Sequence, residues 1–257
     1  KKSIVVYGDY DVDGITATSL LYRFLVKMGA RVSYYIPERQ SEGYGLNLEA
    51  LEHIISDGAS LVITVDCGIS SYDIVEAVCD RIDIIITDHH TAPPQIPPAR
   101  AVINHKQPDC PYRDKNLSGV GVAFKLCQAL WLRQCGEWYL DDLDIVALGT
   151  VADVVPLVGE NRIIVQAGLK KMNELPNLGI DKLIDVAGLH DKTITAGHIG
   201  FTLAPRLNAA GRVTHATRAV ELLVTDDVDL AETIAQELQE TNMERQEIER
   251  SIHEEAR

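Results

Sequence analysis

The stretch VVYGDYDVDG, residues 5–14, decides how this chain can fold, because an apolar run with the character of a buried strand ends in three aspartates. These are Asp9, Asp11 and Asp13, and no Lys or Arg follows until Arg23. Two carboxylates about 4 Å apart repel one another by roughly 4 kcal/mol at an effective dielectric constant near 20. A chain that crowds three acids at the end of a strand therefore needs a positive partner from elsewhere.

Apolar runs alternate with helical patterns over the first 105 residues. Near-continuous Val and Ile runs are typical of strands buried on both faces of a parallel sheet, and strand–helix alternation indicates a doubly wound α/β fold. We expect five strands, at 3–8, 31–37, 60–68, 82–90 and 100–105, and intervening helices at 15–29, 47–58 and 70–80. Further helices are expected at 118–135, 139–153, 161–173, 179–188, 195–203 and 216–224, followed by one long charged helix at 229–257.

Acids and histidines follow three of the predicted strands at the point where each strand ends. The first strand ends in the three aspartates above, the strand over 60–65 ends in Asp66, and the strand over 82–87 ends in Asp88, His89 and His90. Ligands of open α/β sheets bind outside the carboxyl ends of the strands, so these side chains would share one site. Each aspartate alone could instead be a turn former or a helix N-cap, but the two histidines are poor turn formers.

Carboxylates and imidazoles without thiolates suit Mn²⁺ or Mg²⁺ rather than structural zinc. Two such ions, bridged by one carboxylate, can clamp a phosphate for in-line attack. A pair of divalent metal ions would also solve the problem of charge repulsion at the strand ends.

The composition is that of a globular protein with a sizeable core, since 46% of the 257 residues are hydrophobic. No apolar run reaches the roughly 18 residues of a membrane span. Five cysteines without a C-x-x-C pair, and no signal peptide, favour a reducing cytoplasm. The lack of an initial Met and the helical pattern at the end indicate a piece of a longer protein. A net charge of −14, taken alone, points away from nucleic acid.

Seven motifs, in order along nearly the whole chain, carry a specific resemblance to a known family. DYDVDG (9–14), VDCG (65–68), TDHH (87–90) and LGTVADVVPL (148–157) resemble the metal motifs of the DHH phosphoesterases. Three more stretches resemble the RecJ-like exonuclease branch of that family: IPERQSEGYGL (36–46), LSGVGVAFKL (117–126) and APRLNAAGR (204–212).

This resemblance implies a site for two Mn²⁺ or Mg²⁺ ions. Asp11 and Asp13 would each hold a different ion, and Asp66 would bridge the two. His89 and Asp153 would complete the second metal site.

The resemblance also implies roles beside the metals. His90 would face the scissile phosphate as a hydrogen-bond donor or general acid, and Asp88 would orient a histidine from behind the metal ligands. For Asp88, a plain turn residue at the strand end is the alternative. The pyrophosphatase branch of the superfamily has a His where this chain has Tyr7, so one ion would have fewer protein ligands, with Asp9 as a candidate substitute.

Four polar residues are candidates for binding the substrate. Arg39 follows a predicted strand beside two glycines, and the resemblance implies contact with the nucleotide nearest the cut; a surface arginine is the alternative. Arg206, Asn208 and Arg212 lie close together among small residues, and forked guanidinium groups suit phosphate. Helix capping is the alternative for these three. Ser118 is expected to be a helix N-cap beside closely packed small residues.

The function that the resemblance implies is a metal-dependent exonuclease, degrading single-stranded DNA in the 5′-to-3′ direction to 5′-mononucleotides in DNA repair and recombination. A DHH-type phosphodiesterase for short oligonucleotides or cyclic dinucleotides is one alternative. A non-catalytic nucleic-acid-binding scaffold that has lost its metals is another, although the chain retains all the acids and both histidines. Single-stranded DNA, a single-stranded-DNA-binding protein and a helicase are the expected partners, with no membrane.

We expect a DHH phosphoesterase domain over residues 1–228, with its sheet part over about 1–115 and its helical part over about 116–228. The charged stretch 229–257 has weak apolar spacing, so we expect a solvated connector helix to a second domain outside this chain. Bound metal would offset part of the negative charge, and the further domains would supply much of the basic surface.

Overall fold

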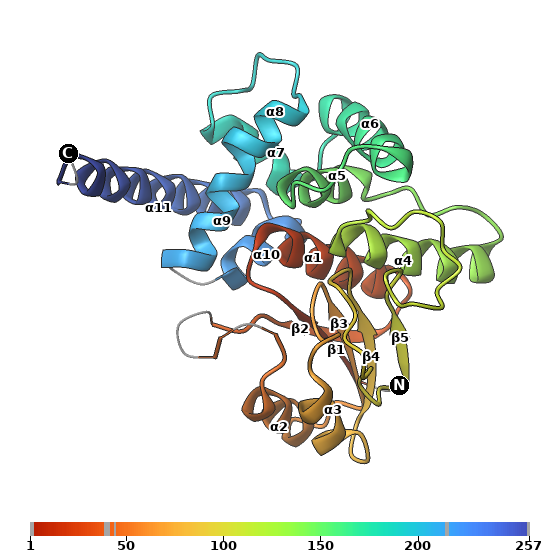
Figure 1. Cartoon of the computed structure of the whole chain (residues 1–257). Helices are drawn as coiled ribbons and strands as arrows, with labels where there is room; N and C mark the ends of the chain where they lie inside the picture. Colours follow the sequence, from red (N-terminus) through yellow and green to blue (C-terminus); the bar gives the residue numbers. More distant parts are fainter. Residues whose placement is uncertain (1–2, 39–41, 44, 214–215, 256–257) are drawn as a thin grey trace.

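The computed structural model describes residues 3–38, 42–43, 45–213 and 216–255, with the backbone alone for 210–213 and 255. Its centre is a five-stranded parallel sheet in the order β2-β1-β3-β4-β5 (Figure 1). The strands are β1 Ser3–Gly8, β2 Arg31–Tyr35, β3 Leu61–Val65, β4 Asp83–Thr87 and β5 Ala101–Ile103. The prediction of a doubly wound α/β fold with five strands is confirmed, and most strands are shorter than their apolar runs.

The strand order places a topological switch point between β1 and β3. The chain passes from β1 to β2 on one side and then crosses to β3 on the other. In the register of the pair, Gly8 at the end of β1 lies opposite Val65 at the end of β3. The residues that follow these two positions therefore emerge side by side, where ligands of doubly wound sheets bind.

Helices cover both faces of the sheet. On one face lie α1 Val12–Lys27 and α4 Gly119–Cys135, and on the other α2 Leu48–Ser56 and α3 Tyr72–Val78 (Figure 1). Alternate residues of β1 separate accordingly, since Val6 joins the core with α1 and α4 whereas Tyr7 joins the core with α2 and α3.

A group of helices extends the larger core beyond the sheet. It comprises α5 Leu143–Ala152, α6 Gly159–Glu174, α7 Leu178–Val186, α8 Ala196–His198, the π-helix η1 Ile199–Leu203, α9 Ala204–Val213, α10 Ala216–Val224 and α11 Val228–Glu255. None of the helices in the described ranges is both long and apolar enough to cross a bilayer.

Helix α9 was not expected, because the helix predicted over 195–203 ends directly before APRLNAAGR, which contains Pro205. A proline within a helix has no N–H and its ring clashes with the carbonyl of the residue four positions earlier, here Phe201. The chain widens into the π-helix over Ile199–Leu203 directly before this proline. The wider turn explains how the helix continues where the sequence predicted an end.

The expectation that the last helix contributes nothing to the core is wrong for the first half of α11. Four of its side chains are buried, with at most 1% exposure: Ala231, Ile234, Ala235 and Leu238. They follow helical spacing, but two are alanines, so the stripe is hidden among many charges. Beyond Asn242 the helix is half-buried or exposed, and its end projects from the body (Figure 1). The connector role and the domain division at residue 228 stay predictions.

Candidate metal centre

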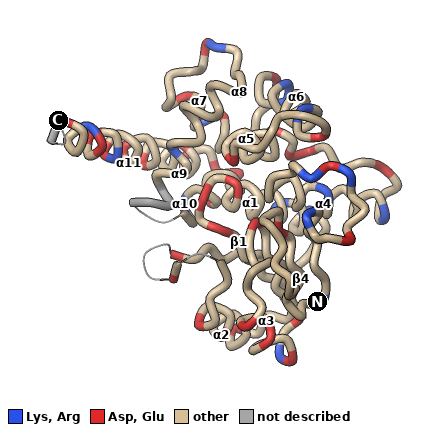
Figure 2. Tube along the Cα trace, in the orientation of Figure 1, with Lys and Arg blue, Asp and Glu red and all other residues tan. Residues whose placement is uncertain are grey.

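The predicted acids and histidines meet at the carboxyl ends of β1, β3 and β4. Figure 2 shows acidic residues gathered where β1 ends and α1 begins. Three overlapping groups have ligand atoms within 4.8 Å of one another: Asp66, His89 and His90; Asp13, His89 and Asp153; and Asp9, Asp11 and Asp66. Every residue that the sequence proposed as a metal ligand therefore lies in one cluster, including Asp153 at the end of α5.

Asp66 lies at the middle of the cluster and is held in a strained backbone conformation. Its φ of 61° is in the left-handed region, which Asp adopts more readily than most residues. The other described non-glycine residue with positive φ is Val154, also at 61°, directly after Asp153. Strain of this kind clusters at functional sites. One strained position here is a candidate metal ligand, and the other directly follows one.

Gly119, at the start of α4, lets the helix approach Asp66 closely. A Cβ atom at this position would lie 2.4 Å from the Oδ1 atom of Asp66. The backbone N–H of Gly119 donates to Asp13 Oδ2 at 2.6 Å, and that of Val120 donates to Asp13 Oδ1 at 2.8 Å. The N-terminus of α4 thus fixes one carboxylate of the site, as helix N-termini do for anions. Ser118 caps α4 as predicted, accepting from the N–H of Gly121 at 3.2 Å.

The helix-capping alternative holds for one of the three aspartates after β1. Asp11 is the N-cap of α1, and its Oδ1 accepts from the N–H of Gly14 at 3.0 Å. A carboxylate has about four lone-pair positions, so this bond leaves Asp11 able to bind a metal as well. Asp9 is instead buried, with 3% exposure, and does not cap the helix.

His89 presents an unprotonated nitrogen to the carboxylates. Its Nδ1 lies 3.2 Å from the carbonyl oxygen of Leu117 and donates to it, which leaves Nε2 without a proton on the neutral ring. Nε2 faces Asp66 Oδ1 at 3.2 Å and Asp13 Oδ2 at 3.8 Å. Burial, with repulsion from His90, lowers the pKa of His89 to about 4, so the ring is neutral at pH 7. The lone pair on Nε2 and those on the two carboxylates therefore face one another, an arrangement that suits a shared cation.

The carboxylates are held in an environment that disfavours their charges. Burial, with repulsion from Asp11, raises the pKa of Asp9 to about 7 and that of Asp153 to about 6. Burial and neighbouring carboxylates also raise the pKa values of Asp13 and Asp66. Within the described residues, Asp9 Oδ1, Asp66 Oδ1 and Asp153 Oδ2 are buried without a hydrogen-bond partner. Buried, unsatisfied carboxylate oxygens beside an imidazole nitrogen fit divalent Mn²⁺ or Mg²⁺.

Asp88 holds the second histidine in place. Its Oδ1 accepts from His90 Nδ1 at 2.8 Å and from the N–H groups of His89 and His90 at 2.7 and 3.0 Å, and its Oδ2 accepts from Ile69 N at 2.9 Å. Burial alone would raise the pKa of Asp88, but these hydrogen bonds outweigh it and lower the pKa. The bond to Asp88 raises the pKa of His90.

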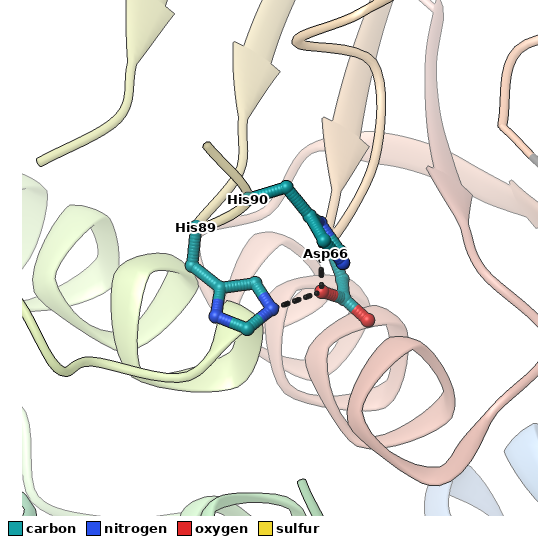
Figure 3. Close-up of side chains that lie close together, drawn as sticks. All are labelled: Asp66, His89 and His90. Atoms are coloured by element: carbon teal, nitrogen blue, oxygen red, sulfur yellow. Dashed lines mark ion pairs between the residues drawn. The ribbon is translucent and has the colours of Figure 1, made fainter. Parts of the chain in front are cut away.

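The two histidines therefore differ in the protonation state that their surroundings favour. His89 is buried and neutral, whereas the His90 side chain is 46% exposed and favours the charged form. Both point toward Asp66 (Figure 3). Asn104, which the sequence analysis missed, donates from Nδ2 to the carbonyl of His90 at 2.9 Å. The signal in the sequence that could have identified Asn104 is its place near the end of the last predicted strand, at the same edge of the sheet as the acids.

The four predicted substrate-binding residues have different outcomes. Arg39 lies outside the described residues, and only the backbone of Arg212 is described, on α9. Asn208 lines a cavity beside the cluster together with Val12 and Ala152. Arg206 donates from Nε to Gln239 Oε1 at 2.7 Å and from Nη1 to the carbonyl of Thr202, so much of its guanidinium is bound within the protein.

Tyr7, which stands where a related branch has a histidine, has its side chain in the other core. It is fully buried and donates to the carbonyl of Gly45 at 3.2 Å. Its ring lies 5.2 Å from that of Tyr35, between ring centres. Tyr7 thus supports the loop after β2 rather than the acidic cluster.

Comparison with known proteins identifies similar sequences over the whole chain. The sequence model described as the DHH family, N-terminal domain, matches residues 3–150. The chain is 44% identical over 257 residues to the single-stranded-DNA-specific exonuclease RecJ of Bacillus subtilis, covering 100% of this chain and 32% of that protein. It is 38% identical over 253 residues to the RecJ of Thermus thermophilus, covering 98% and 37%.

Solved structures give the same picture. An exonuclease RecJ bound to manganese superposes with a TM-score of 0.90 at 37% identity, covering 98% of this chain and 64% of that one. RecJ of Thermus thermophilus in complex with Mn²⁺ superposes with a TM-score of 0.85 at 36% identity, covering 98% and 36%. The chain spans about a third of the length of the two curated RecJ relatives above.

Proposed function

Because the chain belongs to the DHH family, we propose that it carries the catalytic site of a metal-dependent exonuclease that acts on single-stranded DNA. In this proposal the enzyme works in the 5′-to-3′ direction and releases 5′-mononucleotides. The observation that carries the proposal is the contact of His89 Nε2 with Asp66 Oδ1 at 3.2 Å, in a cluster whose buried oxygens need a cation. The similarity to single-stranded-DNA-specific exonucleases supports the choice of substrate.

Five side chains are proposed to hold two Mn²⁺ or Mg²⁺ ions. Asp11 and Asp13 bind different ions, and Asp66 bridges them. His89, through Nε2, and Asp153 complete the second site, while Asp9 is an additional candidate because its Oδ1 is buried without a partner in the described structure. When bound, the ions offset the buried negative charge and polarise the scissile phosphate and the attacking water.

His90 is proposed to hold a proton beside the scissile phosphate. Asp88 accepts from Nδ1 at 2.8 Å and favours the imidazolium, the form in which Nε2 also carries a proton. This N–H can donate to a phosphate oxygen or protonate the 3′ oxygen of the departing nucleotide. Asp88 acts as a positioning residue in this scheme.

The substrate is proposed to be held by Arg39, Asn208 and Arg212, with Arg206 contributing any donor that Gln239 and Thr202 leave available. A single-stranded-DNA-binding protein and a helicase are proposed as partners, on the strength of the family resemblance. A cytoplasmic location, and a role in DNA repair and recombination, follow from the proposed substrate.

The proposal is tested with single-stranded oligonucleotides labelled at the 5′ or the 3′ end, and with a dinucleotide, in the presence of Mn²⁺. We expect early release of labelled 5′-mononucleotide from the 5′-labelled strand, hydrolysis of the dinucleotide, and loss of both with a chelator. Asp66→Asn should abolish hydrolysis, whereas Asp80→Asn, at an exposed aspartate, should leave it unchanged.

Early release from the 3′-labelled strand would overturn the proposed direction. A wild-type protein that binds Mn²⁺ but hydrolyses neither substrate would contradict the catalytic role and favour the scaffold alternative.

A further inference from the structure

A cavity of about 310 Å³ lies beside the acidic cluster and reaches the last helix of the chain. Val12, between Asp11 and Asp13, and Ala152, directly before Asp153, line one side of it. Its volume is at the small end of the range for small-molecule sites. A group bound in this cavity would therefore lie next to the proposed metal ligands.

The far side of the cavity is formed by α9 and α11. Pro205 and Asn208 come from α9, and Arg245 and Glu249 come from α11. Among the cavity-lining residues in the described ranges, Arg245 is the one that carries a positive charge. The cavity that adjoins the acidic cluster therefore has one positively charged lining residue in the described ranges, and it comes from α11.

Arg245 is held in position from two directions. Its Nη2 lies 3.2 Å from Asn242 Oδ1, and Asn242 is 1% exposed. Its Nη1 pairs with Glu249, whose side chain is 60% exposed, while the Arg245 side chain is only 24% exposed. One side of the guanidinium is thus fixed by a buried amide, and the other by a carboxylate at the solvent boundary.

The helix that carries Arg245 is itself anchored to the body of the protein. Leu238 is buried in the core, and Gln239 accepts from Arg206 Nε at 2.7 Å across to α9. Arg245 follows Gln239 by fewer than two helical turns. Its position relative to the metal centre is therefore set by the packed half of α11, not by the projecting half.

We propose that Arg245 binds a backbone phosphate of the DNA strand whose end lies at the metal centre. The inference rests on the proposed function and deepens it by adding a phosphate contact from α11. Exposed ion pairs between residues four apart on a helix are weak, whereas a guanidinium can bind a phosphate through two charge-assisted hydrogen bonds. The incoming phosphate replaces Glu249, which turns into solvent, while Asn242 keeps the guanidinium in place.

The competing explanation is that Arg245 only stabilises α11 through its pair with Glu249. The two explanations differ in what Glu249→Gln does. If Arg245 binds a phosphate of the strand, this variant frees the guanidinium from its ion pair with residue 249 and removes a nearby negative charge. DNA binding then becomes tighter. If the pair is only structural, the loss of the Glu249 charge changes DNA binding equally with and without Arg245, and the helix is slightly less stable.

The test measures binding of a fluorescent single-stranded oligonucleotide with phosphorothioate linkages by anisotropy, with Mn²⁺ at several salt concentrations. Arg245→Ala should weaken binding about tenfold and reduce the slope of log affinity against log salt by about 0.7. Arg245→Lys should keep most of that slope, and Glu249→Gln should tighten binding. Arg250→Ala is the matched control, because Arg250 is an exposed arginine on the same helix and does not line the cavity.

The proposal is overturned if Arg245→Ala binds no more weakly than Arg250→Ala, or if Glu249→Gln tightens binding as much in the Arg245→Ala protein as in the wild type. Thermal melting must show that each variant is folded. Failure of the proposed function has a separate signature, since the wild-type protein would then hydrolyse no dinucleotide in Mn²⁺. The DNA-binding assay thus tests the role of Arg245, and dinucleotide hydrolysis tests the catalytic site.

Discussion

Replacing Asp9 by Asn should stabilise the metal-free protein, and more so at pH 7 than at pH 5. Asp9 is buried, with 3% exposure, and its Oδ1 has no partner in the described residues. Burial, with repulsion from Asp11, raises its pKa to about 7, against about 3.9 in an unfolded chain. A carboxyl group whose pKa is raised by folding costs no stability below the unfolded value, and costs progressively more as the pH rises toward the folded value.

The size of the effect follows from these two pKa values. With about 3.9 unfolded and about 7 folded, the cost is roughly 2 kcal/mol at pH 5 and roughly 4 kcal/mol at pH 7. The gain from Asp9→Asn should therefore grow by about 2 kcal/mol across this interval. Other titrating groups, such as His89, are present in both proteins, so their contributions largely cancel in the comparison.

The assay is urea unfolding of wild type and variant in a chelating buffer at pH 5 and pH 7, with the free energy of unfolding obtained by linear extrapolation. Asp80→Asn, at an exposed aspartate, serves as the control and should differ from wild type by less than about 0.5 kcal/mol at both pH values. Saturating Mn²⁺ should remove the wild-type deficit at pH 7, because the cation takes over the role of the proton.

An Asp9→Asn advantage that is equal at the two pH values would refute the reasoning, since no buried ionisation would then be at work. A wild-type protein that gains no stability from Mn²⁺ at pH 7 would refute it as well.

Three further changes probe other parts of the site. His90→Ala should slow turnover by roughly 10²–10⁴, the usual effect of losing a proton donor, with Mn²⁺ affinity little changed by calorimetry; loss of metal binding in His90→Ala but not in His89→Ala would mean that the two roles are reversed. Gly119→Ala should weaken Mn²⁺ binding, because the added Cβ would lie 2.4 Å from Asp66 Oδ1; unchanged calorimetry would show that the helix can shift. A chain extended past Arg257 should act on long strands far better than this chain, with little difference on a dinucleotide; equal activity on long strands would place the whole binding groove within these residues.

Much of the fold and the cluster could be predicted because both depend on local rules. Five apolar runs, the first four separated by helical patterns, were enough for the parallel sheet. The strand-end rule brought Asp66 and His89 to the acids after β1. Asp153 is different, since it ends a helix that is distant in sequence, and no spacing links it to the strand ends. Only the family resemblance pointed to it.

The parts that were missed depend on tertiary packing. The helix predicted over 195–203 stops before Pro205, but the π-helix at this point lets the helical backbone continue into α9. The buried stripe of α11 includes Ala231 and Ala235, whose weak apolar signal is hidden by charge, so its packing against the body could not be read locally. Arg245 was missed for the same reason, because an arginine on a charged helix has no sequence signal that separates it from its exposed neighbours.

The central claim is that the cluster around Asp66 binds the two divalent ions used for hydrolysis. Anomalous diffraction from crystals grown with Mn²⁺ tests it most directly. We predict two manganese peaks that share the Asp66 carboxylate, with His89 Nε2 and Asp153 beside one of them and His90 beside neither. A single peak, peaks that do not contact Asp66, or manganese bound by His90 in place of His89 would contradict the claim.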